Sequence, residues 1–314
     1  MDELFLPLKP KVQIYIDDIL LISRGNEGEH RDLICKFFDI ANRYQLKISL
    51  EKSQFFAKNI QFLGFDISSS GIKPSSNNVS TLMKRKVPKT MKELYSFIQA
   101  CGYYRRFIPR YSKFCETLYD KCKGRNKLIT LSENDLLAYN HLKEFLINAP
   151  KLAHPNTTGQ FILTTDASNN TIGCTLSQIQ NNVEKPIAYF SQKHKKTVRA
   201  CAPTYLELYA ISRSLHHFKY LLTGCKILIR SDHKPLLHIS NSEDKKYIEL
   251  LEDINQYDCT ITYIPGEANT LSDYLSRINH DDSDDGDSKE PDCNVLTMVT
   301  NIRETEGDAQ QIIK

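Results

Sequence analysis

The sequence of 314 residues lacks several features that mark well-known structural classes. It has no tryptophan, and its nine cysteines form neither a Cys-x-x-Cys pair nor a His/Cys cluster with the spacing of a zinc site. It contains no signal peptide, no apolar run of membrane length and no repeat of solenoid period. These absences exclude a disulfide scaffold, a zinc module and a membrane protein, so we expect free thiols in an intracellular protein without a membrane partner.

The net charge is low, but the acids are unevenly distributed. With 40% hydrophobic and 25% charged residues, the composition is ordinary for a globular chain of two or three domains. Residues 281–292 carry seven acids and one lysine, which is a local charge of −6. Since the net charge of the whole chain is +3, the other residues together carry +9. A basic body suits a polyanionic partner, although many soluble proteins are mildly basic. Residues 280–314 are predicted to be an acidic disordered tail.

The stretch Phe161–Gln178 predicts a β-hairpin with a carboxylate near the end of its first strand. On that strand Asp166 shares a face with Ile162 and Thr164. A carboxylate on such a face is costly to bury unless a partner group offsets its charge. Taken alone, the aspartate is explained by ordinary turn chemistry before two asparagines.

Three later acids change that interpretation. Glu207 borders the apolar face of an amphipathic helix predicted over Thr204–Leu222. Asp232 ends a short buried strand, and Asp273 lies on a short helix after the predicted strand Cys259–Ile264. Together with the hairpin aspartate, these acids can converge on one edge of a mixed sheet, where crowded carboxylates repel one another.

Two divalent cations would balance four such carboxylates. Magnesium prefers oxygen ligands in an octahedral shell, and manganese is an alternative ion. Two metals about 3.5–4 Å apart suit in-line phosphodiester hydrolysis, because one activates the attacking water and the other stabilises the leaving 3′ oxygen.

Seven phrases follow one another in this part of the chain: TTDAS at 164–168, Ile172-Gly173 with Leu176-Ser177-Gln178, PIAYFSQK at 186–193, ELYAI at 207–211, SDHKPL at 231–236, YIPGEAN at 263–269 and SDYLSR at 272–277. By these phrases and their order, residues 161–277 resemble the ribonuclease H domain of gypsy-type long-terminal-repeat retrotransposons. The resemblance implies that Asp166, Glu207, Asp232 and Asp273 are the catalytic, metal-binding carboxylates. Some ribonucleases H carry a mobile histidine shortly before the last carboxylate, but no histidine lies between Pro265 and Asp273.

The segment Lys11–Ser23 resembles the polymerase hairpin of reverse transcriptases, because YIDD stands between two apolar strands with the two aspartates at the tip. An Asp-Asp pair alone indicates only a hairpin tip. The resemblance implies that Asp17 is a metal ligand beside the primer terminus, that Asp18 joins it in the catalytic site, and that Tyr15 faces the nucleic acid. Phe62-Leu63-Gly64 resembles the primer-grip hairpin, although a strand with a close-approach glycine explains it as well.

Residues 75–155 show helical periodicity, with a capping box at Thr90-Met91-Lys92-Glu93. The run KTMKELYSFIQACGYYRRFIPRYS resembles the thumb and connection region of the same family. Arg105, Arg106 and Arg110 alternate with aromatic residues, a pattern that can grip a nucleic-acid backbone. Core tyrosines with solvated arginines explain the pattern equally well.

We therefore predict a multidomain chain of the α+β and α/β classes. Residues 1–75 form the C-terminal part of a reverse-transcriptase palm, and residues 76–155 form a helical thumb and connection. Residues 156–279 form a ribonuclease H-like mixed β-sheet with flanking helices, and residues 280–314 form a tail that leads toward an integrase. The fingers and the palm strand with the third metal-binding aspartate are not in the sequence, so this is interpreted as part of a retrotransposon Pol polyprotein.

The expected function is two-metal hydrolysis of the RNA strand of RNA–DNA hybrids, with polymerase activity lost in this chain. The expected partners are an RNA–DNA hybrid, a primer–template duplex and, in a full-length parent, the other parts of Pol; the oligomeric state is left open. We expect an intracellular location, in a cytoplasmic particle or the nucleus. Two alternatives stand beside this interpretation: a non-catalytic nucleic-acid-binding remnant and an unselected relic.

Overall fold

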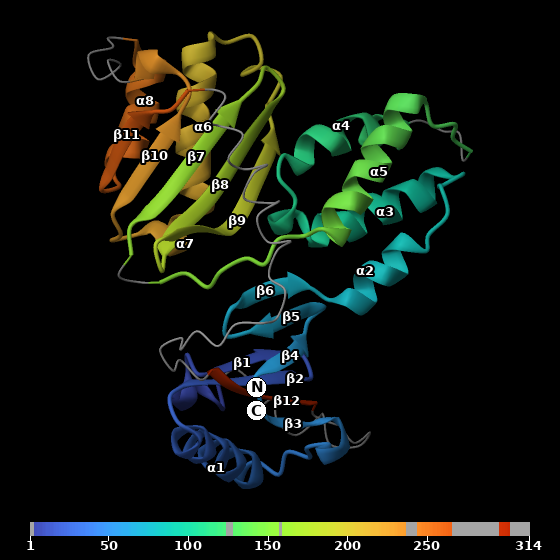
Figure 1. The fold of residues 1–314 in the computed structure, drawn as a ribbon, viewed down its shortest axis with the longest axis vertical. Helices are drawn as coiled ribbons and strands as arrows, with labels where there is room; N and C mark the ends of the chain where they lie inside the picture. The colour runs from blue at the N-terminus through green and yellow to red at the C-terminus, as the bar shows by residue number, and fades with distance from the viewer. Residues whose placement is uncertain (1–2, 124–127, 157–158, 237–243, 266–294, 302–314) are drawn as a thin grey trace, which may run out of the picture. The chain divides into compact units, whose positions relative to one another are not determined.

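The computed structural model describes residues 3–123, 128–156, 159–236, 244–265 and 295–301, and for 295–301 it describes the backbone alone. Its contacts group the chain into two compact units, residues 1–75 with 284–314 and residues 76–283 (Figure 1). No helix in the described ranges is both long enough and apolar enough to cross a membrane.

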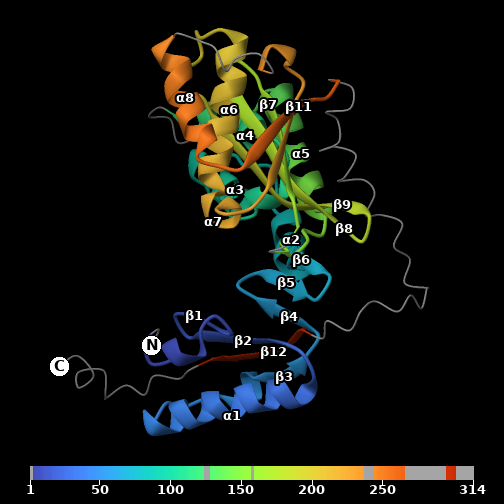
Figure 2. The same cartoon turned by 90° about the vertical axis from the view of Figure 1, so that its left-hand side faces the viewer.

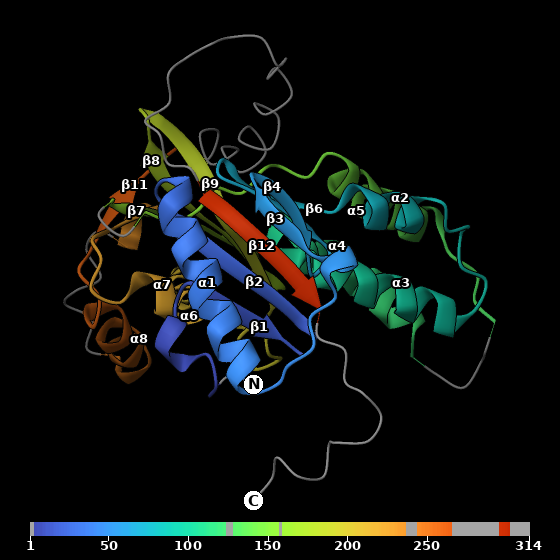
Figure 3. The same cartoon turned by 90° about the horizontal axis from the view of Figure 1, so that it is seen from below.

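The first unit contains a four-stranded sheet with a long helix on one face (Figures 2 and 3). Its elements are β1 (Val12–Tyr15), β2 (Asp18–Arg24), α1 (Glu27–Arg43), β3 (Gln54–Ala57) and β12 (Val295–Asn301), with short 3-10 helices at Leu6–Leu8 and Leu50–Lys52. The strands lie in the order β1-β2-β12-β3, and neighbours are antiparallel. The side chain of Asn26 starts α1 by accepting the N–H of Glu29 at 2.9 Å. Between helix and sheet lie Phe5, Val12, Ile19, Leu21, Leu33, Ile34 and Phe37.

Strand β12 lies within the segment that was predicted to be a disordered tail. It pairs with β2 from Val295 opposite Arg24 to Asn301 opposite Asp18, and it pairs with β3 on its other side. Its sequence VLTMVTN is rich in residues that favour strands, while the acidic run before it dominated the composition of the segment. The prediction of disorder is therefore wrong for these seven residues; residues 280–294 and 302–314 lie outside the described ranges.

A second sheet in the first unit is a three-stranded antiparallel meander of β4 (Asn59–Phe62), β5 (Phe65–Ser68) and β6 (Gly71–Pro74). Phe62 pairs with Phe65, so Leu63 and Gly64 form a two-residue turn. Their φ angles of 48° and 74° give the left-handed backbone that tight hairpin turns require. The glycine of the predicted primer-grip segment is thus a turn residue.

The second unit begins with four helices: α2 (Ser76–Met83), α3 (Met91–Tyr103), α4 (Tyr111–Lys121) and α5 (Glu133–Ile147), with a 3-10 helix at Arg105–Phe107. The predicted capping box at the start of α3 is confirmed, because Thr90 Oγ1 accepts the N–H of Glu93 at 3.2 Å and the Glu93 carboxylate accepts the N–H of Thr90 at 3.3 Å. The buried face of α3 holds Leu94, Phe97, Ile98 and Cys101.

The rest of this unit is a five-stranded mixed sheet with helices α6 (Pro203–His217), α7 (Lys219–Leu222) and α8 (Lys245–Asn255) (Figure 1). Its strands are β7 (Phe161–Ala167), β8 (Thr171–Gln180), β9 (Val183–Lys193), β10 (Ile227–Ser231) and β11 (Cys259–Tyr263), in the order β11-β10-β7-β8-β9. β7, β8 and β9 are antiparallel neighbours, whereas β10 runs parallel to both β7 and β11. The predicted fold class is confirmed.

One apolar core joins this sheet to α6 and α8. Every member of the predicted stripe of α6 is buried in it, namely Leu208, Ile211, Leu215, Phe218 and Leu222. The predicted helix differs in one respect, because it breaks at Phe218 and continues as α7. Helix α8, which the sequence did not predict, adds Leu250 and Ile254 to the core. Since Phe161 and Leu163 face this core, strand alternation directs Asp166 to the other face of the sheet.

Candidate active site

Two of the predicted acids stand at neighbouring strand ends of the mixed sheet. Asp166 is the penultimate residue of β7, and Asp232 directly follows β10. These two strands are parallel, with Thr164 opposite Arg230, so both strands end at the same edge of the sheet. Neither aspartate is fully buried. The structure thus brings the two residues to one sheet edge.

Glu207 of α6 lies beside the same edge and is only 7% exposed. Its Oε1 accepts the backbone N–H of Ala167 at 3.1 Å, which ties the helix to the end of β7. Its Oε2 is buried and makes no hydrogen bond of normal geometry to any described residue, although the Ser231 hydroxyl is close enough to favour the charged form. Glu207 is therefore a buried acid with one oxygen that lacks a well-formed hydrogen bond to the described residues.

The surroundings of Glu207 shift the pKa of its carboxyl group. Burial is the largest cause that raises its pKa to about 8 from an ordinary value of 4.5. The Ala167 N–H opposes this shift, while the negative charges of Asp232 and Asp166 add to it. This influence is in keeping with the positions of the two aspartates at the ends of the neighbouring strands β7 and β10.

This arrangement fits a divalent cation. The donors are carboxylate oxygens, which magnesium prefers, and a cation would offset both the burial of Glu207 and the repulsion from the two aspartates. Within the described ranges, no three His, Cys, Asp or Glu side chains already stand close enough to hold one ion together. The fourth predicted acid, Asp273, lies outside the described residues.

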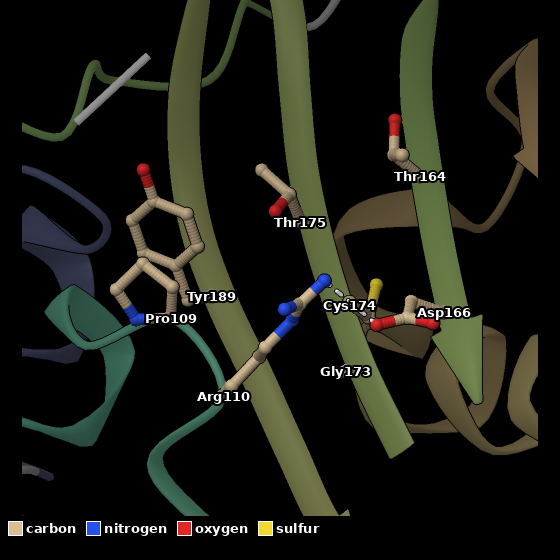
Figure 4. A pocket seen from close by; sticks show the side chains of 8 residues that line it. All are labelled: Pro109, Arg110, Thr164, Asp166, Gly173, Cys174, Thr175 and Tyr189. Atoms are coloured by element: carbon tan, nitrogen blue, oxygen red, sulfur yellow. Dashed lines mark ion pairs between the residues drawn. The ribbon is translucent and has the colours of Figure 1, made fainter. Parts of the chain in front are cut away.

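A small pocket lies on the Asp166 face of the sheet, between β7, β8, β9 and the residues before α4 (Figure 4). In it Arg110 Nη2 lies 2.9 Å from Asp166 Oδ2. Gly173 of β8 stands directly opposite Asp166 in the strand register, and Tyr189 of β9 lines the far side. Arg110, which the sequence assigned to nucleic acid, is here the ion-pair partner of a predicted metal ligand.

The other predicted nucleic-acid residues of this unit lie on the surface. Arg105 and Arg106 belong to the 3-10 helix between α3 and α4, and both are exposed. The guanidinium of Arg106 lies 5.7 Å from the ring centroid of Phe107. The tyrosines around them divide between two roles, because Tyr104 is buried and Tyr103 is 54% exposed. Neither interpretation of this segment, as a nucleic-acid grip or as core tyrosines with solvated arginines, describes all of its residues.

The predicted polymerase residues lie in the first unit, on the β1–β2 hairpin. Tyr15 pairs with Asp18, so the two-residue turn is Ile16-Asp17 and not the predicted Asp17-Asp18. Ile16 takes φ 55°, the left-handed conformation that the first position of such a turn needs and that a β-branched residue rarely adopts. Tyr15 and Asp17 are exposed, while Asp18 opens β2 and is half-buried.

Sequence reasoning missed the groups that surround the three acids. Arg110, which the sequence assigned to nucleic acid, and the Ala167 N–H act across the fold, and no local pattern indicates their contacts with these acids. A signal did exist for Gly173, because its place in a hairpin opposite Asp166 follows from counting back from the turn. The His233 ring, whose Nε2 lies 2.8 Å from Thr204 Oγ1, is a further link between the β10 end and α6.

Two family models match parts of the chain. Residues 1–67 match the family described as reverse transcriptase (RNA-dependent DNA polymerase), a range that includes Tyr15, Asp17 and Asp18. Residues 131–229 match the RNase H-like domain found in reverse transcriptase, a range that includes Asp166 and Glu207 and ends just before Asp232.

Similar curated proteins include polyproteins of transposons. The retrovirus-related Pol polyprotein from transposon opus of Drosophila melanogaster is 34% identical over 278 residues, which is 84% of this chain and 28% of that protein. The corresponding polyprotein from transposon 297 is 32% identical over 95% of this chain and 28% of its own length. The Tf2-3 polyprotein of Schizosaccharomyces pombe is 28% identical over 96% of this chain and 23% of its own length. The chain thus spans under a third of these relatives.

Solved structures with a similar fold include the foamy viral protease-reverse transcriptase. Its complex with double-stranded DNA has a TM-score of 0.71 at 23% identity, over 84% of this chain and 56% of that one. Its complex with an RNA/DNA hybrid has a TM-score of 0.69 at 22% identity, over 84% of this chain and 36% of that one. At this identity the likeness concerns the fold. The chain therefore carries a reverse transcriptase segment and a ribonuclease H-like domain of a retrovirus-related Pol polyprotein.

Proposed function

We propose that the domain built on β7 to β11 hydrolyses the RNA strand of RNA–DNA hybrids with two magnesium ions, as a gypsy-type retrotransposon enzyme. One observation carries the proposal: among the described residues, one oxygen of the buried Glu207 lacks a well-formed hydrogen bond, and burial and the charges of Asp232 and Asp166 raise its pKa. A structural acid would be paired, whereas an acid in this environment needs a cation for its charged form.

The residues of this chain would act as follows. Asp166, Glu207, Asp232 and Asp273 would hold the two ions, which when bound supply an activated water and stabilise the leaving oxygen. Glu207 is oriented by the Ala167 N–H, so its free oxygen is fixed relative to β7. The parallel strands β7 and β10 hold the two aspartates on a rigid sheet, which limits the motion of the donor set.

Nucleic-acid binding is the second part of the proposal. The exposed Arg105 and Arg106, in a chain whose formal charge is +9 outside the acidic segment 281–292, support contact with a phosphate backbone. The structural relatives were determined with double-stranded DNA and with an RNA/DNA hybrid, the two duplex types proposed as partners here.

For the reverse transcriptase segment, we propose that primer extension belongs to a longer Pol protein. Asp17 and Asp18 are adjacent on one hairpin, with one in the turn and the other at the start of a strand. Two neighbouring carboxylates cannot enclose two metal ions. The 314-residue chain is therefore expected to incorporate no deoxynucleotides on a primed RNA template; incorporation that Asp17→Asn abolishes would contradict this.

The nuclease proposal is tested by cleavage of a hybrid with a labelled RNA strand in magnesium. The wild-type chain should cut the RNA strand, and Asp166→Asn should not. Asp120→Asn is the matched control, because Asp120 is an exposed aspartate of α4 that pairs with Lys123. Binding without cleavage in the wild type would favour the non-catalytic remnant, and neither binding nor cleavage would favour the relic.

A further inference from the structure

Arg110 reaches the sheet from the segment that precedes α4. Its Nη2 lies 2.9 Å from Asp166 Oδ2, and the two side chains are 39% and 40% exposed. Figure 4 shows the guanidinium extended across β8 toward the end of β7. This places a fixed positive charge on the oxygen that the proposed nuclease would offer to a metal ion.

The backbone around Arg110 is held in an unusual conformation. Arg110 has φ 51° and ψ 30°, the left-handed region that non-glycine residues rarely adopt. Contacts with β9 hold the start of α4 in place: the Ser112 N–H donates to Ser191 Oγ at 2.7 Å, and Lys193 Nζ lies 2.7 Å from Glu116 Oε1. A strained residue that neighbouring contacts hold in place is a common mark of a functional position.

The sheet leaves room for this side chain. Gly173 stands opposite Asp166, and a Cβ added to Gly173 would lie 3.4 Å from Arg110 Cγ. A larger residue at Gly173 would therefore press against the stem of Arg110. The glycine, the strained backbone and the two contacts between α4 and β9 are independent features that all favour the same ion pair.

We propose that Arg110 is a built-in counter-ion of Asp166, which competes with the divalent metal ion for this carboxylate, so that α4 controls metal loading. The inference rests on the proposed function only in taking Asp166 as a metal ligand. A guanidinium and a magnesium ion repel each other, and the ion needs the carboxylate oxygens that the guanidinium binds. Metal binding releases Arg110, and the freed guanidinium is then available for a phosphate group.

The test measures manganese binding to the metal-free 314-residue chain by electron paramagnetic resonance in the absence of nucleic acid. Arg110→Ala should bind manganese about two- to fivefold more tightly, because the variant no longer has to break an exposed ion pair. This change in affinity corresponds to about 0.4–1 kcal/mol. Arg110→Gln keeps the length of the side chain over Gly173 without its charge and should behave in the same way.

Two controls separate competition from loosening of the structure. Lys193→Ala removes another ion pair between α4 and β9 without touching Asp166, and it should leave manganese affinity unchanged. In an Asp166→Asn background, Arg110→Ala should also have no effect, because the shared carboxylate charge is gone. A gain in Lys193→Ala as large as that in Arg110→Ala would overturn the proposal, and so would an equal gain without Asp166.

The outcomes also separate this inference from the nuclease proposal. Equal manganese affinity in the wild type, Arg110→Ala and Arg110→Gln would refute the counter-ion role, even if the wild type cleaved hybrids. Absence of cleavage by the wild type would refute the nuclease proposal, while tighter manganese binding by both Arg110 variants would still support the competition for Asp166.

Discussion

Replacing Glu207 by glutamine should stabilise the ribonuclease H-like sheet at neutral pH. In the metal-free chain Glu207 is buried, and its pKa is raised to about 8 from an ordinary value of 4.5. The folded state therefore keeps a proton that the unfolded state loses as pH rises above 4.5, so stability falls between these two pH values. Glutamine keeps the acceptor for the Ala167 N–H and does not ionise.

The size of the effect follows from the same two values. At pH 7 the interval above the ordinary pKa is about 2.5 units, and each unit corresponds to about 1.36 kcal/mol, so Glu207→Gln should gain about 3 kcal/mol. Below pH 4.5 both the folded and the unfolded state hold Glu207 protonated, and the gain should vanish. Since the chain has two units, one global free energy of unfolding is not a suitable measure.

Hydrogen exchange of peptides from β7 and β8 gives the local free energy of opening instead. The ratio of exchange rates between wild type and Glu207→Gln at the same pH cancels the intrinsic pH dependence of exchange. The variant should be better protected at pH 7 and equal to the wild type at pH 4. Lower protection in the variant, or a difference independent of pH, would refute the account of the buried acid.

The remaining predictions concern the acids, the metal and the duplex. Asp232→Asn should lower the rate of hybrid cleavage at least about a hundredfold, or about 2.7 kcal/mol, without changing the far-UV circular dichroism spectrum; cleavage at the wild-type rate would remove Asp232 from the site. Calcium in place of magnesium should allow hybrid binding with little cleavage, because its looser shell positions water poorly; equal rates in both ions would contradict this. Arg105→Ala with Arg106→Ala should flatten the slope of log K against log salt on B-DNA by up to about 0.9 for each phosphate that the two arginines neutralise, and an unchanged slope would leave both residues as surface arginines.

The acids at the sheet edge were predictable because each depends on a local pattern. Asp166 and Asp232 follow apolar strand segments, and Glu207 borders a helical stripe, so period and position sufficed. The capping box at Thr90 is equally local, since both partners lie within one turn. The same reasoning gave the succession of strands and helices around the mixed sheet, apart from β9, α8 and the break at Phe218.

What could not be predicted depends on contacts between distant segments. The ion pair of Arg110 and Asp166 joins the start of α4 to the end of β7, and nothing near either residue indicates it. Strand β12 owes its place to pairing with β2 and β3, while the composition of its surroundings indicated disorder. The hairpin tip lies one residue earlier than expected, because the strand pairing places Ile16 in the turn with a left-handed backbone that isoleucine rarely adopts.

The most direct test of the account is the rate at which the purified chain cleaves the RNA strand of an RNA–DNA hybrid in magnesium, compared with Glu207→Gln. Magnesium should protect β7 and β8 from hydrogen exchange in the wild type more than in the variant, which confirms that the ion binds at this carboxyl. The wild type is predicted to cleave, and the better-protected variant to be at least about a hundredfold slower, because a metal ligand is removed. Cleavage by Glu207→Gln at the wild-type rate would contradict the assignment of this sheet edge as a metal-dependent nuclease site.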